Sequence, residues 1–349
     1  MRIEPFGSPV SFHRWRAHYA VVLMIALLPS IGCRRQTPSA AGPTKVSIGI
    51  QVSPAMTLLM VAKEKGFFQQ QGLDVDLKQF TAGKFALQAF FAQSLDFAVS
   101  GEVPVCLAVL GGNRVRVVTQ VVEKTVDEVR IVTRKDGSYS ASDPSSYFKA
   151  RKRRLATSFG GGPEFFTYTF LQHYNVTPSQ VELLSQRPED MPTALASKSV
   201  DAISIFDPFA YIAEKQLNQN GGTFRASELY SELYVLVAHP NRTDQDAATI
   251  NALLRAMKQA ETFTAANPEE AKQILASYTK LDRGIIDGIW TDFSFKLALT
   301  QELLSDWNAE ANWAKATGKV ASQMPAPNFS ESIDSHFLQS VEPNAVKLQ

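Results

Sequence analysis

Strand and helix alternate most clearly from residue 46 to residue 80, which reads VSIGIQVSPAMTLLMVAKEKGFFQQQGLDVDLKQF. Residues 46–50 are apolar and β-branched, which is typical of a strand. Ser53 and Pro54 then offer an N-cap followed by a proline at the first helical position. Residues 73–80 alternate apolar and polar side chains, as a half-buried strand does. This order predicts a βαβ unit with parallel strands.

The same alternation continues along the rest of the chain. Further strand patterns lie at residues 97–99, 115–122, 129–133, 155–158, 181–185, 202–206 and 234–238. Helical patterns separate several of them, and the chain becomes mainly helical from there to about residue 316. We therefore expect an α/β protein whose sheets are mainly parallel and flanked by helices.

The composition excludes several classes of protein. The chain has 349 residues, which is long enough for two lobes, and a formal net charge of +1. The protein therefore has no large overall positive charge that would attract nucleic acid. An apolar content of 45% is ordinary for a globular protein and argues against both disorder and a protein with many membrane spans.

The N-terminal 33 residues are predicted to be an export signal. Basic residues lead, and the uncharged apolar run at residues 19–28 is too short to span a membrane but fits a signal peptide. Gly32 before Cys33 resembles the end of a bacterial lipobox, so we expect Cys33 to be lipidated; cleavage elsewhere and release is the alternative. Residues 34–44 are small, polar and Pro-containing, which predicts a tether.

Several motifs in a fixed order carry a resemblance to a known family. Residues 62–68 read AKEKGFF and are followed by GLDV at residues 72–75. Residues 89–97 read AFFAQSLDF, with Ser94 where the family usually has glycine. The other matching segments are ALASKSVDA at residues 194–202, the triplet Phe206-Asp207-Pro208, and FLQSVEPNAVKL at residues 337–348. From about Lys45 onward the chain resembles the type II periplasmic solute-binding proteins of ABC importers, in the class that serves sulfonates, nitrate and thiamine precursors.

The resemblance implies a two-lobe type II periplasmic binding protein fold. Residues 45–126 and 237–349 would form lobe one, and residues 127–236 lobe two. The ligand would lie in the cleft and the lobes would close on it by a hinge motion. The implied partners are a small-molecule ligand, an ABC permease and the membrane through the lipid at Cys33, with the chain a periplasmic or cell-surface monomer. A ligand-sensing partner of a membrane receptor is the alternative, and an enzyme similar to thiamine-pyrimidine synthases is the minor one.

Ligands of open α/β sheets bind outside the carboxyl ends of the strands. That rule selects loops that each open a helix, where free N–H groups favour polar ligand groups. The serines and glycines could equally cap helices and make turns. The predicted ligand-binding residues are Ser53, Pro54, Thr81, Gly83, Ser100, Gly101, Glu102, Gly160, Gly161, Gly162, Glu164, Phe206 and Asp207.

Three of these residues narrow the ligand class. Carboxylates at Glu102, Glu164 and Asp207 would repel a bare dianion and suit a ligand with an amine or ring N–H. We expect an aminosulfonate or aminopyrimidine-like solute. The alternative is that Glu164 complements a helix N-terminus and that Asp207 caps the helix after it.

The remaining motifs do not indicate catalysis. None of the five histidines has metal-ligand spacing, and no Gly-x-Ser-x-Gly elbow occurs. We expect no catalytic residue, no metal and no cofactor. A basic cluster at Lys149, Arg151, Lys152, Arg153 and Arg154 is expected to be solvated surface, with docking to the permease or membrane as the alternative.

Overall fold

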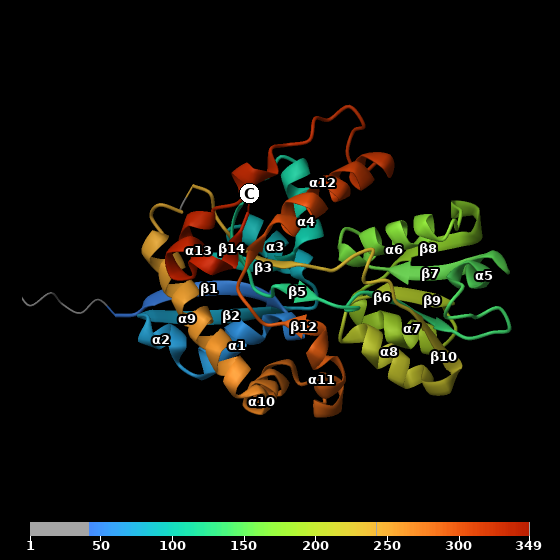
Figure 1. The fold of residues 1–349 in the computed structure, drawn as a ribbon, viewed down its shortest axis with the longest axis horizontal. Helices are drawn as coiled ribbons and strands as arrows, with labels where there is room; N and C mark the ends of the chain where they lie inside the picture. The colour runs from blue at the N-terminus through green and yellow to red at the C-terminus, as the bar shows by residue number, and fades with distance from the viewer. Residues whose placement is uncertain (1–41, 242, 349) are drawn as a thin grey trace, which may run out of the picture. The chain divides into compact units, whose positions relative to one another are not determined.

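The computed structural model describes residues 42–241 and 243–348, which are built around two five-stranded sheets (Figure 1). The first sheet has the order β2-β1-β3-β11-β4. Its strands are β2 (Leu73–Phe80), β1 (Thr44–Gln51), β3 (Phe97–Gly101), β11 (Tyr234–Ala238) and β4 (Arg116–Gln120). β1 pairs in parallel with β2 and β3, whereas β11 is antiparallel to both of its neighbours.

The second sheet has the order β10-β6-β9-β7-β8. Its strands are β10 (Gly221–Phe224), β6 (Arg130–Arg134), β9 (Ala202–Ile205), β7 (Arg153–Thr157) and β8 (Val181–Ser185). β7 pairs in parallel with β8 and β9, and β6 is antiparallel to β9 and β10. Each sheet is therefore mainly parallel, with one reversed strand where the chain enters it from the other sheet.

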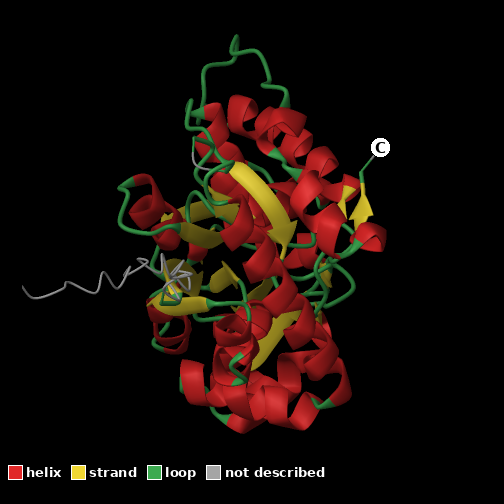
Figure 2. Cartoon of the chain, turned by 90° about the vertical axis from the view of Figure 1, so that its left-hand side faces the viewer, coloured by secondary structure: helices red, strands yellow, loops and turns green. Residues whose placement is uncertain are grey.

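Helices enclose both sheets (Figure 2). The helices that accompany the first sheet are α1 (Thr57–Glu64), α2 (Phe67–Gln70), α3 (Gly83–Phe91), α4 (Glu102–Leu110), α9 (Ala247–Ala266), α10 (Pro268–Thr279), α11 (Arg283–Ile289), α12 (Gln301–Ala316) and α13 (Ser335–Val341). Those of the second sheet are α5 (Pro144–Lys149), α6 (Gly162–His173), α7 (Met191–Ala196) and α8 (Phe209–Leu217). Two short pairs complete the described structure, β5 (Lys124–Thr125) with β12 (Phe293–Ser294) and β13 (Leu299–Thr300) with β14 (Val346–Lys347).

Burial along the strands follows their place in the sheet. Every residue of the interior strands β3, β11 and β9 is buried, because helices cover both faces. The edge strand β2 alternates buried and exposed side chains over its first four residues, as its sequence predicts. The first helical segment breaks at Gly66, whose φ of 71° lies in the left-handed region that glycine adopts without strain.

α5 and β10 are among the elements that the sequence did not predict. Asp143 caps α5, and Tyr147 and Phe148 bury their rings. α8 is the helix that the capping alternative for Asp207 predicts after the Phe206-Asp207-Pro208 triplet, and the edge strand β10, antiparallel to β6, comes after it. The export signal, Cys33 and residues 34–41 of the tether lie outside the described residues, while Thr44 already belongs to β1.

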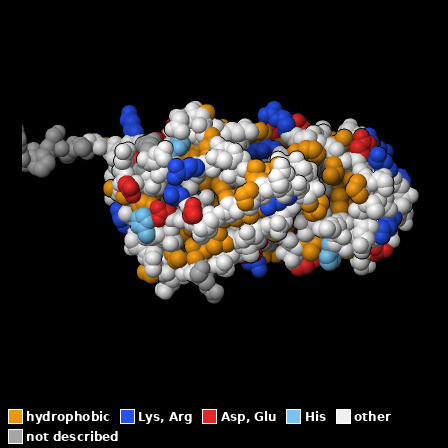
Figure 3. Space-filling model, turned by 90° about the horizontal axis from the view of Figure 1, so that it is seen from above, with side chains coloured by type: hydrophobic (Ala, Val, Ile, Leu, Met, Phe, Trp, Pro, Cys, Tyr) orange, Lys and Arg blue, Asp and Glu red, His pale blue; other side chains and the backbone are white. Residues whose placement is uncertain are grey.

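No helix among the described residues is long and apolar enough to cross a bilayer. Both positive and negative side chains lie on the face displayed in Figure 3.

Candidate functional site

A cavity of about 10 Å³ lies where the loops of the two sheets meet. The chain passes from the first sheet to the second at residues 121–129, the first crossing, and returns at residues 225–233, the second crossing. The walls of the cavity come from both sheets and from the second crossing. The lining residues are Gln51, Ala82, Gly83, Lys84, Gly101 and Pro104, then Ser158, Gly161, Gly162, Pro163 and Phe206, and finally Glu232. This volume holds about one water molecule, so the cleft is closed in this structure.

Lys84 ties the two sides of the cleft together. It lies in the first turn of α3, and its Nζ donates to the Ser158 hydroxyl and to the Phe159 carbonyl, each at 2.9 Å. Burial lowers the pKa of Lys84, against the opposing effect of Glu164. Both of these hydrogen bonds therefore join α3 to the loop after β7 across the cleft.

Glycines allow the backbone to approach closely here. A Cβ on Gly83 would lie 2.8 Å from the Ser100 Cα, and the Gly83 N–H donates to Gln51 Oε1 at 2.8 Å. A Cβ on Gly101 or Gly162 would collide with the carboxyl group of Glu232. The starts of α4 and α6 thus enclose that carboxyl group from two sides.

The structure brings together five of the predicted ligand-binding residues at the cavity: Gly83, Gly101, Gly161, Gly162 and Phe206. The other eight are not among its lining residues: Ser53, Pro54, Thr81, Ser100, Glu102, Gly160, Glu164 and Asp207. Ser53 caps the turn of Pro54–Met56 by accepting from the Ala55 N–H at 3.2 Å. The hydroxyl of Ser100 is buried and has no partner among the described residues.

The predicted carboxylates already have partners in the protein. Glu102 accepts from the Tyr230 hydroxyl and, at 2.7 Å, from the Leu233 N–H, so it fastens the second crossing to α4. Glu164 accepts from the Gly160 N–H at 2.6 Å and pairs with Lys319 at 2.7 Å. These contacts indicate that Glu102 and Glu164 have structural roles.

Asp207 forms a buried ion pair. Its two oxygens accept from Arg130 at 2.8 and 3.0 Å, and the side chain of Asp207 is fully buried. One oxygen also accepts from the Tyr211 N–H at 3.1 Å in the first turn of α8, as the capping alternative expects. Contact between Asp207 and a ligand stays a prediction, and the geometry favours a structural role.

Glu232 is the residue that sequence reasoning missed. It lies just before β11, whose reversed direction puts its amino end beside the carboxyl end of β3: Tyr234 pairs with Gly101. A rule that searches only after strand ends passes over that position. The same holds for Glu128, which precedes the reversed strand β6 and accepts from the Tyr234 hydroxyl at 2.6 Å. Each strand that follows a crossing has a glutamate just before it, Glu128 before β6 and Glu232 before β11, and this pattern in the sequence could have identified both residues.

Four glutamates are buried in the interior, and one of them, Glu232, lines the cavity; the others are Glu102, Glu128 and Glu310. Burial, the largest cause for each, raises all four pKa values well above the ordinary value of a carboxyl group. Their mutual repulsion acts in the same direction. The interior beside the cleft therefore carries more carboxyl groups than it can hold ionised.

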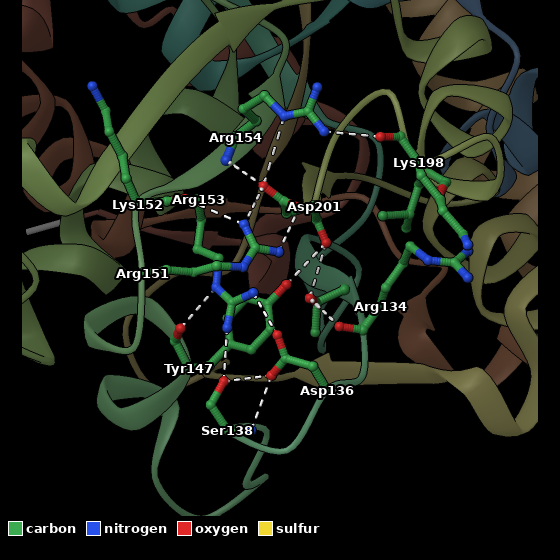
Figure 4. Close-up of polar contacts among 12 residues, drawn as sticks. Arg134, Asp136, Ser138, Tyr147, Arg151, Lys152, Arg153, Arg154, Lys198 and Asp201 are labelled. Carbon is green, nitrogen blue, oxygen red and sulfur yellow. Dashed lines mark hydrogen bonds and ion pairs between the residues drawn. The ribbon is translucent and has the colours of Figure 1, made fainter.

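The basic run of the sequence is largely neutralised by acidic partners (Figure 4). Arg151 forms two hydrogen bonds with Asp201, at 2.8 and 3.2 Å. Arg153 is buried, pairs with Asp136 at 2.6 Å and lies over the Tyr147 ring. Arg154 is exposed and donates to the Lys198 carbonyl, and the exposed Lys149 and Lys152 complete the run. The three arginines of the run therefore hold segments around the second sheet together.

The described residues hold no group of three His, Cys, Asp or Glu side chains that could bind a metal ion.

A family model described as "NMT1/THI5 like" matches residues 53–271, which is more than half of the chain. A putative binding protein of Brucella abortus is 23% identical over 278 residues, covering 78% of this chain and 81% of that protein.

Solved structures share the fold. The periplasmic aliphatic sulphonate binding protein of Escherichia coli has a TM-score of 0.68 at 17% identity, covering 81% of this chain and 96% of that one. The periplasmic nitrate-binding protein of Synechocystis has a TM-score of 0.67 at 16% identity, covering 86% and 89%. A desulfurization enzyme also shares it, with a TM-score of 0.62 at 14% identity over 86% of this chain and 99% of that one. The two-lobe periplasmic binding protein fold predicted from the sequence is confirmed.

Proposed function

The chain belongs to the NMT1/THI5-like family, and we propose that it is the extracytoplasmic solute-binding component of an ABC importer. In this proposal it captures a small polar organic solute between its lobes and presents the closed, loaded form to a permease. Lobe one consists of residues 45–126 and 237–349, and lobe two of residues 127–236.

The observation that carries the proposal is the cavity that both sheets line. Its walls combine the starts of α3 and α4 with the start of α6, and Lys84 bridges them. A space of about 10 Å³ is far below the 300–1,000 Å³ of ordinary small-molecule sites. A solute therefore enters only after the lobes separate, which is the hinge motion that such a protein uses.

The chemistry of the cavity supports a ligand with nitrogen-bound hydrogens. Helix-start glycines offer a close approach to the backbone, while Glu232 adds a carboxyl group with one oxygen that has no partner among the described residues. An aminosulfonate or an aminopyrimidine-like solute matches that combination better than bare nitrate or sulfate does. Phe206 supplies an apolar wall.

The test is a thermal-shift screen of the exported domain, residues 42–349, against aminosulfonates, aminopyrimidines, nitrate and aromatic acids. A ligand that binds only the folded protein raises the melting temperature. We expect a shift with a nitrogen-bearing solute and, in small-angle scattering, a smaller radius of gyration when it is bound. If no solute of these four classes raised the melting temperature, the proposal would be contradicted.

In this proposal a lipid attached to Cys33 holds the domain at the membrane surface, on the outer side of the inner membrane or on the cell surface, and the residues between Cys33 and β1 act as the tether. We expect Cys33→Ala to move the protein from the membrane fraction to the soluble fraction. A variant that stays with the membranes would contradict the lipid anchor and leave solute binding untouched.

A further inference from the structure

The carboxyl group of Glu232 has an unusual position in the closed cleft. It lies between Gly101 at the start of α4 and Gly162 at the start of α6, and it lines the cavity. The residue is only 4% exposed, and its Oε2 has no hydrogen-bond donor among residues 42–241 and 243–348. Burying a carboxylate without a hydrogen-bond donor costs free energy, so this group is stable there only when it is protonated or paired with a cation.

The groups around Glu232 are mostly acidic. Repulsion by Glu128, from the first crossing, and by Glu310, from α12, raises the pKa of Glu232. Glu232 in turn raises the pKa of Glu102 at the start of α4. The hydroxyls of Tyr230 and Tyr234 are taken by Glu102 and Glu128. Neither of these two hydroxyls is left to stabilise negative charge on Glu232.

The nearby cations are committed elsewhere. Lys84 lines the same cavity, but its ammonium group donates to Ser158 and to the Phe159 carbonyl. Arg130 is held by Asp207 and by Glu214 at 3.0 Å. Burial and the repulsion of Glu128 and Glu310 raise the pKa of Glu232 well above its ordinary value. Both effects favour the protonated form of this carboxyl group in the cleft.

We propose that Glu232 is the subsite for a cationic nitrogen of the solute, and that binding this nitrogen displaces the proton that Glu232 holds in the empty cleft. The O–H bond of the carboxyl group breaks, the proton leaves to solvent, and the carboxylate accepts an N–H from the bound cation. One proton is released for each cation bound. The inference rests on the proposed function, because the cation must be part of the captured solute.

Taurine and isethionate are the probes, since they share a sulfonate and a two-carbon chain and differ in an ammonium or a hydroxyl group. Calorimetry of residues 42–349 near neutral pH, in buffers of different ionisation enthalpy, measures the protons released. We expect about one proton per taurine bound and none for isethionate. In Glu232→Gln the release should vanish and the preference for taurine should fall by about 10- to 100-fold, as loss of one charge-assisted hydrogen bond predicts.

Glu228→Gln is the matched control, because Glu228 is an exposed carboxylate four residues earlier on the same segment. It should keep both the release and the preference. Taurine binding without proton release, or the same release in Glu232→Gln, overturns the proposal while solute binding stands.

A second measurement needs no ligand. Carbon-13 spectra of protein labelled at glutamate carboxyl carbons identify Glu232 by the signal that Glu232→Gln removes. We expect that signal at the protonated position in the empty protein near neutral pH, and an ionised position overturns the proposal. A protonated Glu232 in a chain that binds no solute in the screen would instead count against the proposed function.

Discussion

At the scale of single residues, two glycines set the position of Glu232. Replacing Gly162 with alanine would put a methyl group 2.8 Å from the Glu232 Cδ and against the Tyr230 hydroxyl. We expect Gly162→Ala to lower the free energy of unfolding by about 1–3 kcal/mol, the usual cost of overpacking. Urea denaturation measures the change.

The neighbouring glycine is the control for that substitution. A Cβ on Gly161 would meet the Ser158 carbonyl at 3.5 Å and Pro163 Cδ at 3.6 Å, which are ordinary contacts. Gly161→Ala should change stability by less than about 1 kcal/mol. Equal losses in the two variants would mean that crowding by Glu232 does not constrain residue 162.

Asp207 and Arg130 give a second prediction at this scale. Removing one partner of a buried ion pair leaves an uncompensated charge and costs about 3–5 kcal/mol. We expect Asp207→Asn to approach that loss in urea denaturation, softened by the contact of Arg130 with Glu214. Glu270→Gln, which breaks an exposed pair with Lys65, should cost less than about 1 kcal/mol. A loss as small for Asp207→Asn would contradict the structural role.

The site residues were only partly predictable from the sequence. The strand-end rule found five cavity residues, because these lie at or after the carboxyl ends of strands that face the cleft: Gly83, Gly101, Gly161, Gly162 and Phe206. It could not find Glu232, since the direction of a strand depends on which partner it pairs with across the sequence. A list of loops also does not say which carboxylates are already paired inside the protein.

At the scale of elements, strand and helix patterns predicted both sheets well where apolar runs were long. They failed for α5, where two buried aromatics sit in a polar stretch, and for β10, a four-residue edge strand. They also did not give the reversal of β6 and β11, which comes from the crossings and not from local sequence. Local pattern fixes element type, whereas pairing partners fix direction.

The contact between α3 and the loop after β7 can be tested as a tie between the lobes. Lys84→Met keeps the aliphatic stem but removes two hydrogen bonds of the ammonium group, each worth about 1.5–3 kcal/mol as a charged bond. We expect a larger radius of gyration in the ligand-free variant than in the unmodified protein. Small-angle scattering measures it.

Lys78→Met serves as the comparison for that variant. Lys78 is an exposed lysine on β2 that pairs with Asp76, its neighbour on the same strand. Its loss should leave the scattering curve unchanged. If Lys84→Met scatters like Lys78→Met, the Lys84 contacts do not hold the cleft closed.

At the scale of the whole molecule, the buried acids make stability depend on pH in an unusual direction. Besides the four glutamates of the interior, burial raises the pKa of Asp306 to about 7 and that of Asp292 to about 6. The folded protein therefore holds protons that the unfolded chain releases above about pH 4. Raising the pH from about 5 to 7 then favours the unfolded state.

We expect the free energy of unfolding to fall between pH 5 and pH 7, by about 2 kcal/mol from Asp306 alone and further from the other buried acids, measured by urea titrations across that range. Acids whose pKa values are lowered by basic partners, such as Glu123 beside Lys347, contribute the opposite slope only at more acidic pH. Asp306→Asn should flatten the decline. Stability that rises through this interval would show that the buried acids are ionised in the folded protein.

The reversed strand β11 also orders the events by which the chain is made. It lies between β3 and β4, so the sheet begun by the first strand has a gap at its middle until residue 238 has been synthesised. Residues 130–224 contain every strand of the other sheet and can complete it before that point. The sheet whose first strand is synthesised first is therefore completed last. Until β11 is added, the unpaired strand edges of this sheet are exposed, and the nascent chain is then most in need of protection from aggregation.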